Sequence, residues 1–442
     1  MTCPRVLIVY HSCINKADSN TVSLRNWFAE WPKDSLAQIY SGNEVGDHRF
    51  CGHTFCLGLD ERRFGRLFFW LKRSSLGETG QSHSLSKDQA LIGDRMGDVA
   101  RLKNAVASKM LGSGLWELMF PPVISLGMAK WIEDFKPDVI YVQGYHLSIV
   151  WLAISLQDRF ALPICYHAVD DWPRFLYANS FVSRYIRPFV ESAAQKLIES
   201  SSVRFSIGDR MANEYNSRYG LEIESLMICD SLERFRTAKP CRLVQDDCIS
   251  ILYSGGLGHY RWKSLVDLSV AARVLENQGT KVKILVFTSS VPPEASEALR
   301  DLSNVHFEPL PSHKELPGIL KGADILFLPE SFDPVEADVI RLSVSTKAPL
   351  YMMSGNPILV YGSSETGVVD YAKQSEWGYV VEKQDVELLA AAIRRLQEDI
   401  VLRQKIVTKA LEVAERNHEA SNVRKRLLAG LLRAVGAHSP MH

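Results

Sequence analysis

The stretch 343–362, SVSTKAPLYMMSGNPILVYG, decides how the second half of the chain folds. It opens with hydroxyl residues and a lysine, which are typical of the start of a helix. Gly355 would end this helix, because glycine adopts the left-handed conformation of a C-cap at little cost. The apolar run 357–361 is typical of a buried strand. The stretch therefore predicts a short helix that leads through a glycine into a strand.

The start of this helix is also a candidate anion site. The first N–H groups of a helix have no partners within it, and the positive end of the helix dipole lies there. Ser345 and Thr346 add hydroxyl groups, and Lys347 adds a cation. We expect these three residues to bind an anion, and a nucleotide-sugar diphosphate is our hypothesis. Taken alone, the stretch is equally compatible with a capped helix that only packs on a sheet.

Short apolar runs alternate with helical segments along both halves of the chain, which predicts parallel, doubly wound sheets. The predicted fold class is α/β, with two Rossmann-like domains that face a central cleft and a C-terminal helical tail. The charged segment 231–247 lacks a clear period and marks the boundary. We expect domains at 1–235 and 236–420, and a helix at 421–442 that packs back on the first domain.

Composition excludes some classes of protein. The chain has 442 residues, which is long for one domain, and its formal net charge of +0 argues against a general nucleic-acid binder. Its eight cysteines lack metal-site spacing and are typical of the reduced thiols of a cytoplasmic protein. We expect neither a signal peptide nor a membrane-spanning segment.

The basic and aromatic segment ERRFGRLFFWLKR, at 61–73, is the one candidate for membrane contact. As a helix it would carry phenylalanines on one broad face, with the basic residues from Arg62 to Arg73 around it. Such a helix can rest on anionic lipid at the inner face of the membrane. A core helix with a solvated charged side fits the same pattern.

A second candidate phosphate site follows the strand 249–253. The sequence SGGLGHYRWK at 254–263 predicts a strand, a glycine-rich turn and a helix, an arrangement that lets backbone N–H groups approach a phosphate. It matches neither a P-loop nor the dinucleotide fingerprint. We expect the turn residues and two cations to bind a diphosphate: Gly255, Gly256, Leu257, Arg261 and Lys263.

In the N-terminal half, polar residues follow the ends of predicted strands, where open α/β sheets bind ligands. His11, Asn15 and Asn20 come after the first strand and would line an acceptor pocket, or belong to an ordinary surface loop. His167 and Asp170 come after the strand 162–167 and would face the cleft. A structural histidine is the alternative for His167.

Carboxylates also lie between a strand end and the first anion site. Glu330 and Asp333 could accept hydrogen bonds from sugar hydroxyls, or form an acidic solvated loop. Asp170 and Asp171 are adjacent, and neighbouring side chains diverge, so we expect no metal site there.

Taken in order, YSGGLGHYRWK, ADILFLP and STKAPLYMMSGNPILVYG resemble the GT-B glycosyltransferases. Within these they resemble the large bacterial family of retaining, nucleotide-sugar-dependent enzymes called family 4, over about residues 249–398. The resemblance implies transfer of a sugar from a nucleotide-diphosphate sugar to a glycan or lipid-linked acceptor. We expect no metal and no other cofactor, because two cations and a helix dipole can balance the charge of the leaving group. The first domain would be the acceptor side and the second the donor side.

The resemblance also assigns roles to residues. Gly256 and Leu257 would donate backbone N–H groups to the diphosphate, while Arg261 and Lys263 would balance its charge. The helix start at 345–347 would hold its other side. His167 would approach the donor sugar from the opposite domain, which makes it a third candidate catalytic residue beside the two cations.

The sequence departs from the family at two points. Leu342 and Leu350 stand where the family has two glutamates, which contact the sugar and the ribose. Glu308 and Pro309 replace a glycine, which bears on recognition of the base. The sequence thus predicts a glycosyltransferase of polysaccharide or glycolipid synthesis. A nucleotide-sugar epimerase and a non-catalytic partner subunit that binds a sugar nucleotide are the alternatives.

Overall fold

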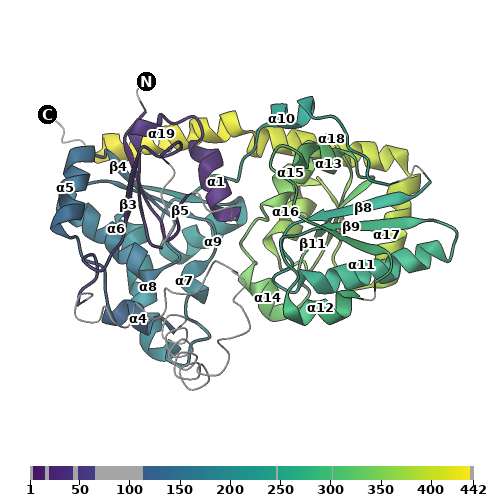
Figure 1. Ribbon diagram of the computed structural model, residues 1–442, viewed down its shortest axis with the longest axis horizontal. Coiled ribbons are helices and arrows are strands. Elements are labelled where there is room, and N and C mark those ends of the chain that lie inside the picture. Colours follow the sequence, from purple (N-terminus) through teal and green to yellow (C-terminus); the bar gives the residue numbers. More distant parts are fainter. Residues whose placement is uncertain are drawn as a thin grey trace, which may run out of the picture.

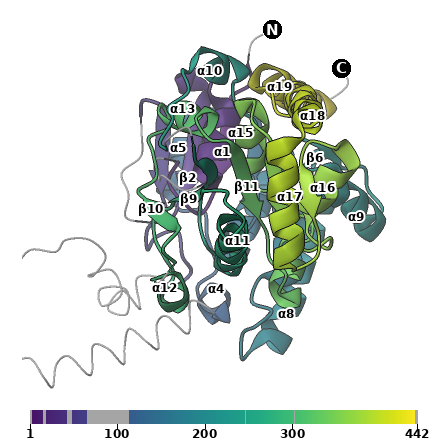
Figure 2. The same cartoon turned by 90° about the vertical axis from the view of Figure 1, so that its right-hand side faces the viewer.

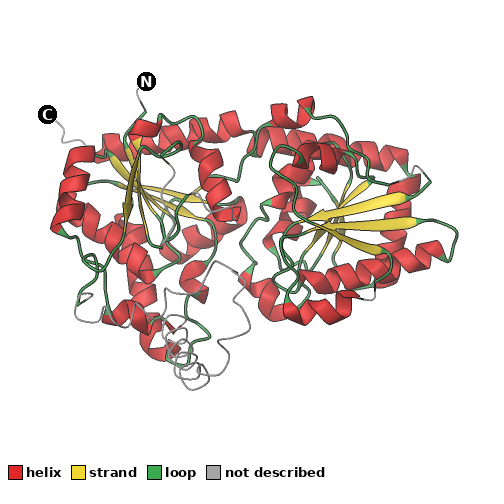
Figure 3. Cartoon of the chain, in the orientation of Figure 1, coloured by secondary structure: helices red, strands yellow, loops and turns green. Residues whose placement is uncertain are grey.

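The computed structural model describes residues 3–14, 19–42, 48–64, 113–244, 247–300 and 302–438. Two α/β domains lie side by side, and long helices connect them along one edge (Figure 1). Each domain has one parallel sheet with helices on both faces (Figure 3). The fold class predicted from the alternation of strands and helices is therefore confirmed.

The first sheet has seven parallel strands in the order β3-β2-β1-β4-β5-β6-β7. Its strands are β1 (Val6–Val9), β2 (Leu36–Tyr40), β3 (His53–Cys56), β4 (Val139–Val142), β5 (Ile164–Ala168), β6 (Val203–Ser206) and β7 (Glu224–Ser225). Its helices are α1 (Ser19–Phe28), α4 (Leu115–Met119), α5 (Leu126–Phe135), α6 (Leu147–Phe160), α7 (Trp172–Phe175), α8 (Ser183–Ser200) and α9 (Asp209–Tyr219). The central strands are apolar at every position because helices cover both of their faces.

The second sheet has six parallel strands in the order β10-β9-β8-β11-β12-β13. Its strands are β8 (Ile249–Ser254), β9 (Val282–Phe287), β10 (Val305–Glu308), β11 (Ile325–Pro329), β12 (Ile358–Tyr361) and β13 (Tyr379–Val381). Its helices are α10 (Leu232–Thr237), α11 (Arg261–Glu276), α12 (Pro293–Arg300), α13 (Leu316–Lys321), α14 (Pro334–Val339), α15 (Lys347–Ser354), α16 (Gly367–Ser375), α17 (Val386–Glu398) and α18 (Ile400–Asn417). Helices α11 and α17 lie side by side on one face (Figure 2).

Both sheets reverse their strand order at one place, and this place positions the site. In the first sheet the reversal lies between β1 and β4, and in the second between β8 and β11. Parallel sheets bind ligands in the crevice outside the strand ends at such a switch point. The residues that follow these four strands are therefore the candidates for a ligand site.

The chain crosses between the domains twice, at 229–232 and at 418–420. The two crossings are hydrogen bonded to each other, since Asp230 N donates to His418 O and Ala420 N donates to Asp230 O. Helix α19 (Ala420–His438) then returns along the first domain (Figure 1), where Val423, Leu427 and Leu431 are buried in its core.

Candidate functional site

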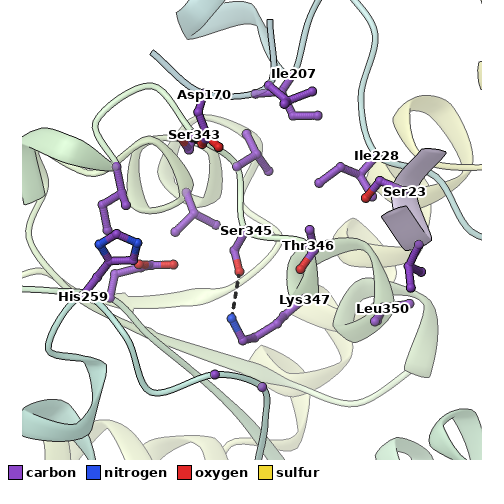
Figure 4. A pocket seen from close by; sticks show the side chains of 18 of the residues that line it. Ser23, Asp170, Ile207, Ile228, His259, Ser343, Ser345, Thr346, Lys347 and Leu350 are labelled. Carbon is purple, nitrogen blue, oxygen red and sulfur yellow. Dashed lines mark hydrogen bonds between the residues drawn. The ribbon is translucent and has the colours of Figure 1, made fainter. Parts of the chain in front are cut away.

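A cavity of about 610 Å³ lies between the two domains, at the carboxyl edges of both sheets. Its polar part comes mainly from the second domain and includes the turn after β8, the residue after β11 and the start of α15. Figure 4 shows Ser345, Thr346 and Lys347 among the side chains that line it. Its apolar part includes Val22, Ile207 and Ile228 from the first domain and Val344 and Leu350 from the second.

Lys347 is the central cation of the cavity. Its side chain lies across the turn after β8, so close that a Cβ on Gly255 would come within 2.0 Å of Lys347 Cε. Gly255 also has a φ of +152°, which favours glycine. Lys347 Nζ lies 3.4 Å from Ser345 Oγ (Figure 4). Burial and the neighbouring charge of Arg261 lower the pKa of Lys347 to about 7. This amine is thus poised to gain a proton when an anion arrives.

Arg261 provides a second cation and is held by a buried carboxylate. Its Nη2 and Nε donate to Glu330 Oε2 at 2.9 and 3.1 Å, and the two side chains are 13% and 2% exposed. Glu330 follows β11 and packs against Gly362, where a Cβ would come within 2.6 Å of Glu330 Cβ. The pair keeps the guanidinium at the cavity wall.

The glycine-rich turn and α15 are joined by tyrosines. Ser254 N donates to the hydroxyl of Tyr351, which lies on α15, at 2.8 Å, and the Tyr253 hydroxyl donates to Gly256 O. The side chain of Thr346, the N-cap of α15, does not cap the helix. Ala348 N donates instead to Ser345 O at 3.0 Å, and Pro349 has no N–H, so the start of α15 offers an anion mainly its dipole and the side chain of Lys347.

The same turn contains two non-glycine residues in the left-handed region. His259 and Tyr260 have φ values of 55° and 53°. His259 lines the cavity, and its Nδ1 lies 2.7 Å from Glu336 Oε2. Strain of this kind persists only where the surrounding structure enforces it, and it gathers at binding sites.

The loop 340–346 joins the wall of the cavity to the first domain. Ser343 Oγ donates to Asp170 Oδ1 at 2.6 Å, and Tyr145 OH donates to the other carboxylate oxygen at 2.7 Å. Burial raises the pKa of Asp170. Leu342 is 2% exposed and belongs to the core of the first domain. Leu342, where the sequence resemblance placed a family glutamate, thus packs between the domains.

The structure places most of the residues predicted from the sequence around this one cavity. They are Gly255, Gly256, Arg261, Glu330, Ser345, Thr346 and Lys347 from the second domain and Asp170 from the first. The side chain of Leu257 lies in the core of the second domain, where it is 2% exposed, and the role predicted for its backbone N–H stays a prediction.

Lys263 does not line the cavity, contrary to the expectation that it joins Arg261. Its Nζ lies 3.9 Å from the centroid of the Tyr260 ring, beside a separate hollow of about 150 Å³ that Asp333 also lines. Two residues that are two positions apart on a helix are rotated by about 200° around its axis, so their side chains lie on nearly opposite sides. Arg261 and Lys263 therefore cannot face one ligand group. Asp333 caps α14, because its carboxylate accepts from Val335 N and Glu336 N.

His167 is likewise not a cavity residue. It is fully buried, with Nδ1 2.7 Å from Tyr141 OH and Nε2 3.0 Å from Leu226 O, and its ring packs against Trp27. This is the structural alternative that the sequence left open. The position therefore corrects the expectation that His167 approaches the donor sugar.

Among the remaining candidates, His11 packs beside the rings of Tyr145 and His146 and does not line the cavity. Asn15 and the side chain of Asn20 lie outside the described residues. Of the basic segment from Arg62 to Arg73, only residues 62–64 are described.

Sequence reasoning missed Gln143 and His259, which line the cavity. Gln143 directly follows β4, and this place at the switch point of the sheet could have identified it. Within the described residues, no three His, Cys, Asp or Glu side chains are grouped as a metal site would need. None of the described helices is both long and apolar enough to cross a membrane.

Comparison with solved structures assigns the fold. The chain superposes on trehalose-6-phosphate synthase from Burkholderia multivorans with a TM-score of 0.61 at 14% identity, over 99% of this chain and 100% of that one. Sucrose-phosphate synthase from Thermosynechococcus elongatus gives 0.60 at 14% identity, over 98% and 99%. Anabaena HepE, solved in complex with UDP and glucose, gives 0.59 at 12% identity, over 97% and 99%.

The chain has the GT-B fold. Its structural neighbours over nearly the whole length are GT-B glycosyltransferases. A scan of protein-family models and a search of curated proteins give no match.

Proposed function

We propose that this protein is a glycosyltransferase that moves a sugar from a nucleotide-diphosphate sugar to an acceptor, without a metal. The observation that carries the proposal is the position of Lys347, across Gly255 and beside Arg261, at the start of α15 in the interdomain cavity. The GT-B neighbours support it, since one of them was solved with UDP and glucose and another is described as UDP-forming.

In this proposal the site acts on the leaving group. The bond between the sugar carbon and the diphosphate breaks heterolytically, an acceptor hydroxyl bonds to that carbon, and its proton passes to an oxygen of the diphosphate. Negative charge therefore develops on the departing diphosphate as the first bond breaks. Protonated Lys347, Arg261 and the positive end of the α15 dipole stabilise that charge. Glu330 fixes Arg261 in place, and closure around the cavity excludes water. Two cations and a helix terminus then fulfil the role that a metal has in other transferases.

The finer assignments rest on the sequence resemblance. By that resemblance, the enzyme transfers a hexose with retention of configuration, as in family 4. The acceptor is a glycan or lipid-linked precursor of a surface polysaccharide or glycolipid. The expected setting is the cytoplasm at the inner face of the membrane. The apolar lining of the cavity, with Ile207, Ile228 and Leu350, gives the acceptor a non-polar surface to pack on.

The experiment measures release of nucleoside diphosphate from a panel of UDP-, GDP- and ADP-sugars, with and without glycan acceptors. Lys347→Met should abolish release, because the leaving group loses its main cation. Lys263→Met is the matched control and should retain it, since Lys263 lies outside the cavity. Nucleotide binding without turnover would favour the non-catalytic partner. Free epimerised sugar nucleotide would favour an epimerase.

A further inference from the structure

Gln143 is a buried polar residue of the cavity, and it takes no part in the proposed stabilisation of the leaving group. It directly follows β4 and is 1% exposed, yet it lines the cavity on the side of the first domain. No described group donates a hydrogen bond to its Oε1. A buried acceptor without a donor is unfavourable by itself, so it points to a group that the ligand supplies.

A chain of buried hydrogen bonds fixes which end of the Gln143 amide faces the cavity. Leu226 O can only accept, so the proton of His167 lies on Nε2, and His167 Nδ1 accepts from Tyr141 OH. The Tyr141 oxygen then accepts from Gln143 Nε2 at 3.2 Å. Because each bond sets the direction of the next, Oε1 is the amide atom left for a ligand.

The opposite orientation is ruled out by the same groups. If Oε1 faced Tyr141, the hydroxyl would donate to it, and His167 Nδ1 would need a proton to stay bonded. With its one proton on Nδ1, a neutral ring would point the lone pair of Nε2 at Leu226 O, which is itself an acceptor. Only a doubly protonated ring would avoid this repulsion. Burial lowers the pKa of His167 to about 3, which keeps the ring neutral at neutral pH.

The backbone after β4 is also tightly held. Gly144 has a φ of +96°, and a Cβ there would come within 2.5 Å of the Trp172 ring. Tyr145 follows with a φ of 71°, which is uncommon for a residue with a side chain. This constrained turn begins directly after Gln143 and restricts the backbone that carries its side chain.

We propose that Gln143 determines specificity at the first-domain wall of the cavity by accepting a hydrogen bond from a sugar hydroxyl. Tyr141 and His167 are positioning residues that orient its amide without touching the ligand. The inference deepens the proposed function and rests on it. An oriented acceptor selects a group that carries a hydrogen and disfavours fluorine, a keto oxygen or a methyl ether in the same place.

The first test needs no ligand. Nitrogen-15 NMR of the protein with labelled histidine should show His167 as the neutral tautomer with its proton on Nε2. A proton on Nδ1 would overturn the orientation of the amide and the proposal with it.

The second test uses the nucleotide sugar that is turned over in the panel, together with its monodeoxyfluoro analogues. Wild-type protein should discriminate against one analogue about tenfold in kcat/KM, and Gln143→Leu should remove that discrimination. Tyr141→Phe should weaken it in the wild-type background and have no further effect in the Gln143→Leu background. Equal discrimination in Gln143→Leu and wild type would overturn the proposal.

Tyr215→Phe is the matched control. Tyr215 is also fully buried in the first domain, but its hydroxyl donates to Asp171, which Arg218 also holds, outside the chain of hydrogen bonds to Gln143. It should lower stability and leave discrimination unchanged. If it changed discrimination as Tyr141→Phe does, general loosening of the sheet would replace the proposal. If no nucleotide sugar is turned over, the proposed function fails, whereas normal turnover without a Gln143 effect refutes this inference alone.

Discussion

Lys347 and Gly255 are in direct contact in this protein: the lysine side chain occupies the space that a Cβ on Gly255 would need. The contact joins the start of α15 to the turn after β8, which are 92 positions apart in the sequence (347 − 255). Lys347 can therefore occupy this position only because residue 255 is a glycine.

Gly255→Ala should displace Lys347 and lower nucleoside diphosphate affinity at least tenfold. An alanine at a φ of +152° is also strained, by about 1–3 kcal/mol. Gly258→Ala is the control, because a Cβ there meets no atom within 4 Å. Calorimetric titration with UDP, GDP and ADP measures the effect, and equal affinities for the two variants would contradict it.

Diphosphate binding should weaken as pH rises above 7. The pKa of Lys347 is about 7 in the free protein, and a bound diphosphate raises it, so binding above pH 7 takes up a proton. The contribution of Lys347 to affinity is therefore fully present below pH 7 and falls with rising pH, by up to about tenfold per pH unit, until the pKa of the complex is reached.

Titration in two buffers with different ionisation enthalpies measures that proton uptake. It should be small at pH 6 and approach one proton at pH 8–9, where the diphosphate itself is already fully ionised. The Lys347→Met variant should show no proton uptake when the diphosphate binds. Uptake that is the same in the variant and the wild type would assign the proton to another group.

Arg261→Ala should destabilise the protein by about 3 kcal/mol even without ligand, because it leaves Glu330 buried with no counter-charge. Adding Glu330→Gln should recover part of the loss. Arg242→Ala breaks a more exposed pair with Asp324 and should cost less than about 1 kcal/mol. Thermal unfolding measures all three, and similar losses for Arg261→Ala and Arg242→Ala would refute the account of the pair.

Leu342→Glu should separate the domains at the cavity, since it would bury a carboxylate in the core of the first domain. The radius of gyration from small-angle X-ray scattering should increase, and the Ser343–Asp170 hydrogen bond should be lost. Leu388→Glu is the control, because Leu388 is 47% exposed. An unchanged radius of gyration for Leu342→Glu would show that this leucine does not hold the domains together.

Local patterns in the sequence predict the sheets and the second-domain part of the site. The runs 249–253 and 357–361 are apolar because both faces are covered, and the glycine-rich turn and the start of α15 are local features. The rest depends on partners distant in the sequence. His167 is fixed by Tyr141 and Leu226 on other segments of the first domain, and no local pattern reveals that its ring is fully buried and does not line the cavity.

Leu342 and Lys263 illustrate two further reasons. Leu342 is explained only by its contact with the other domain, which local sequence does not encode. Lys263 could have been placed correctly, since its spacing of two residues from Arg261 puts the two side chains on different sides of α11.

The most direct test of a nucleotide-diphosphate site at Lys347 is thermal unfolding of the wild type and of Lys347→Met with UDP, GDP, ADP, CDP and dTDP. At one hundred times its dissociation constant, a bound nucleotide should stabilise the wild type by about 2.7 kcal/mol. We predict this shift for at least one nucleotide in the wild type and none in Lys347→Met. No shift with any nucleotide, or an equal shift in the variant, would contradict the claim that this cavity binds a nucleotide-sugar donor through Lys347.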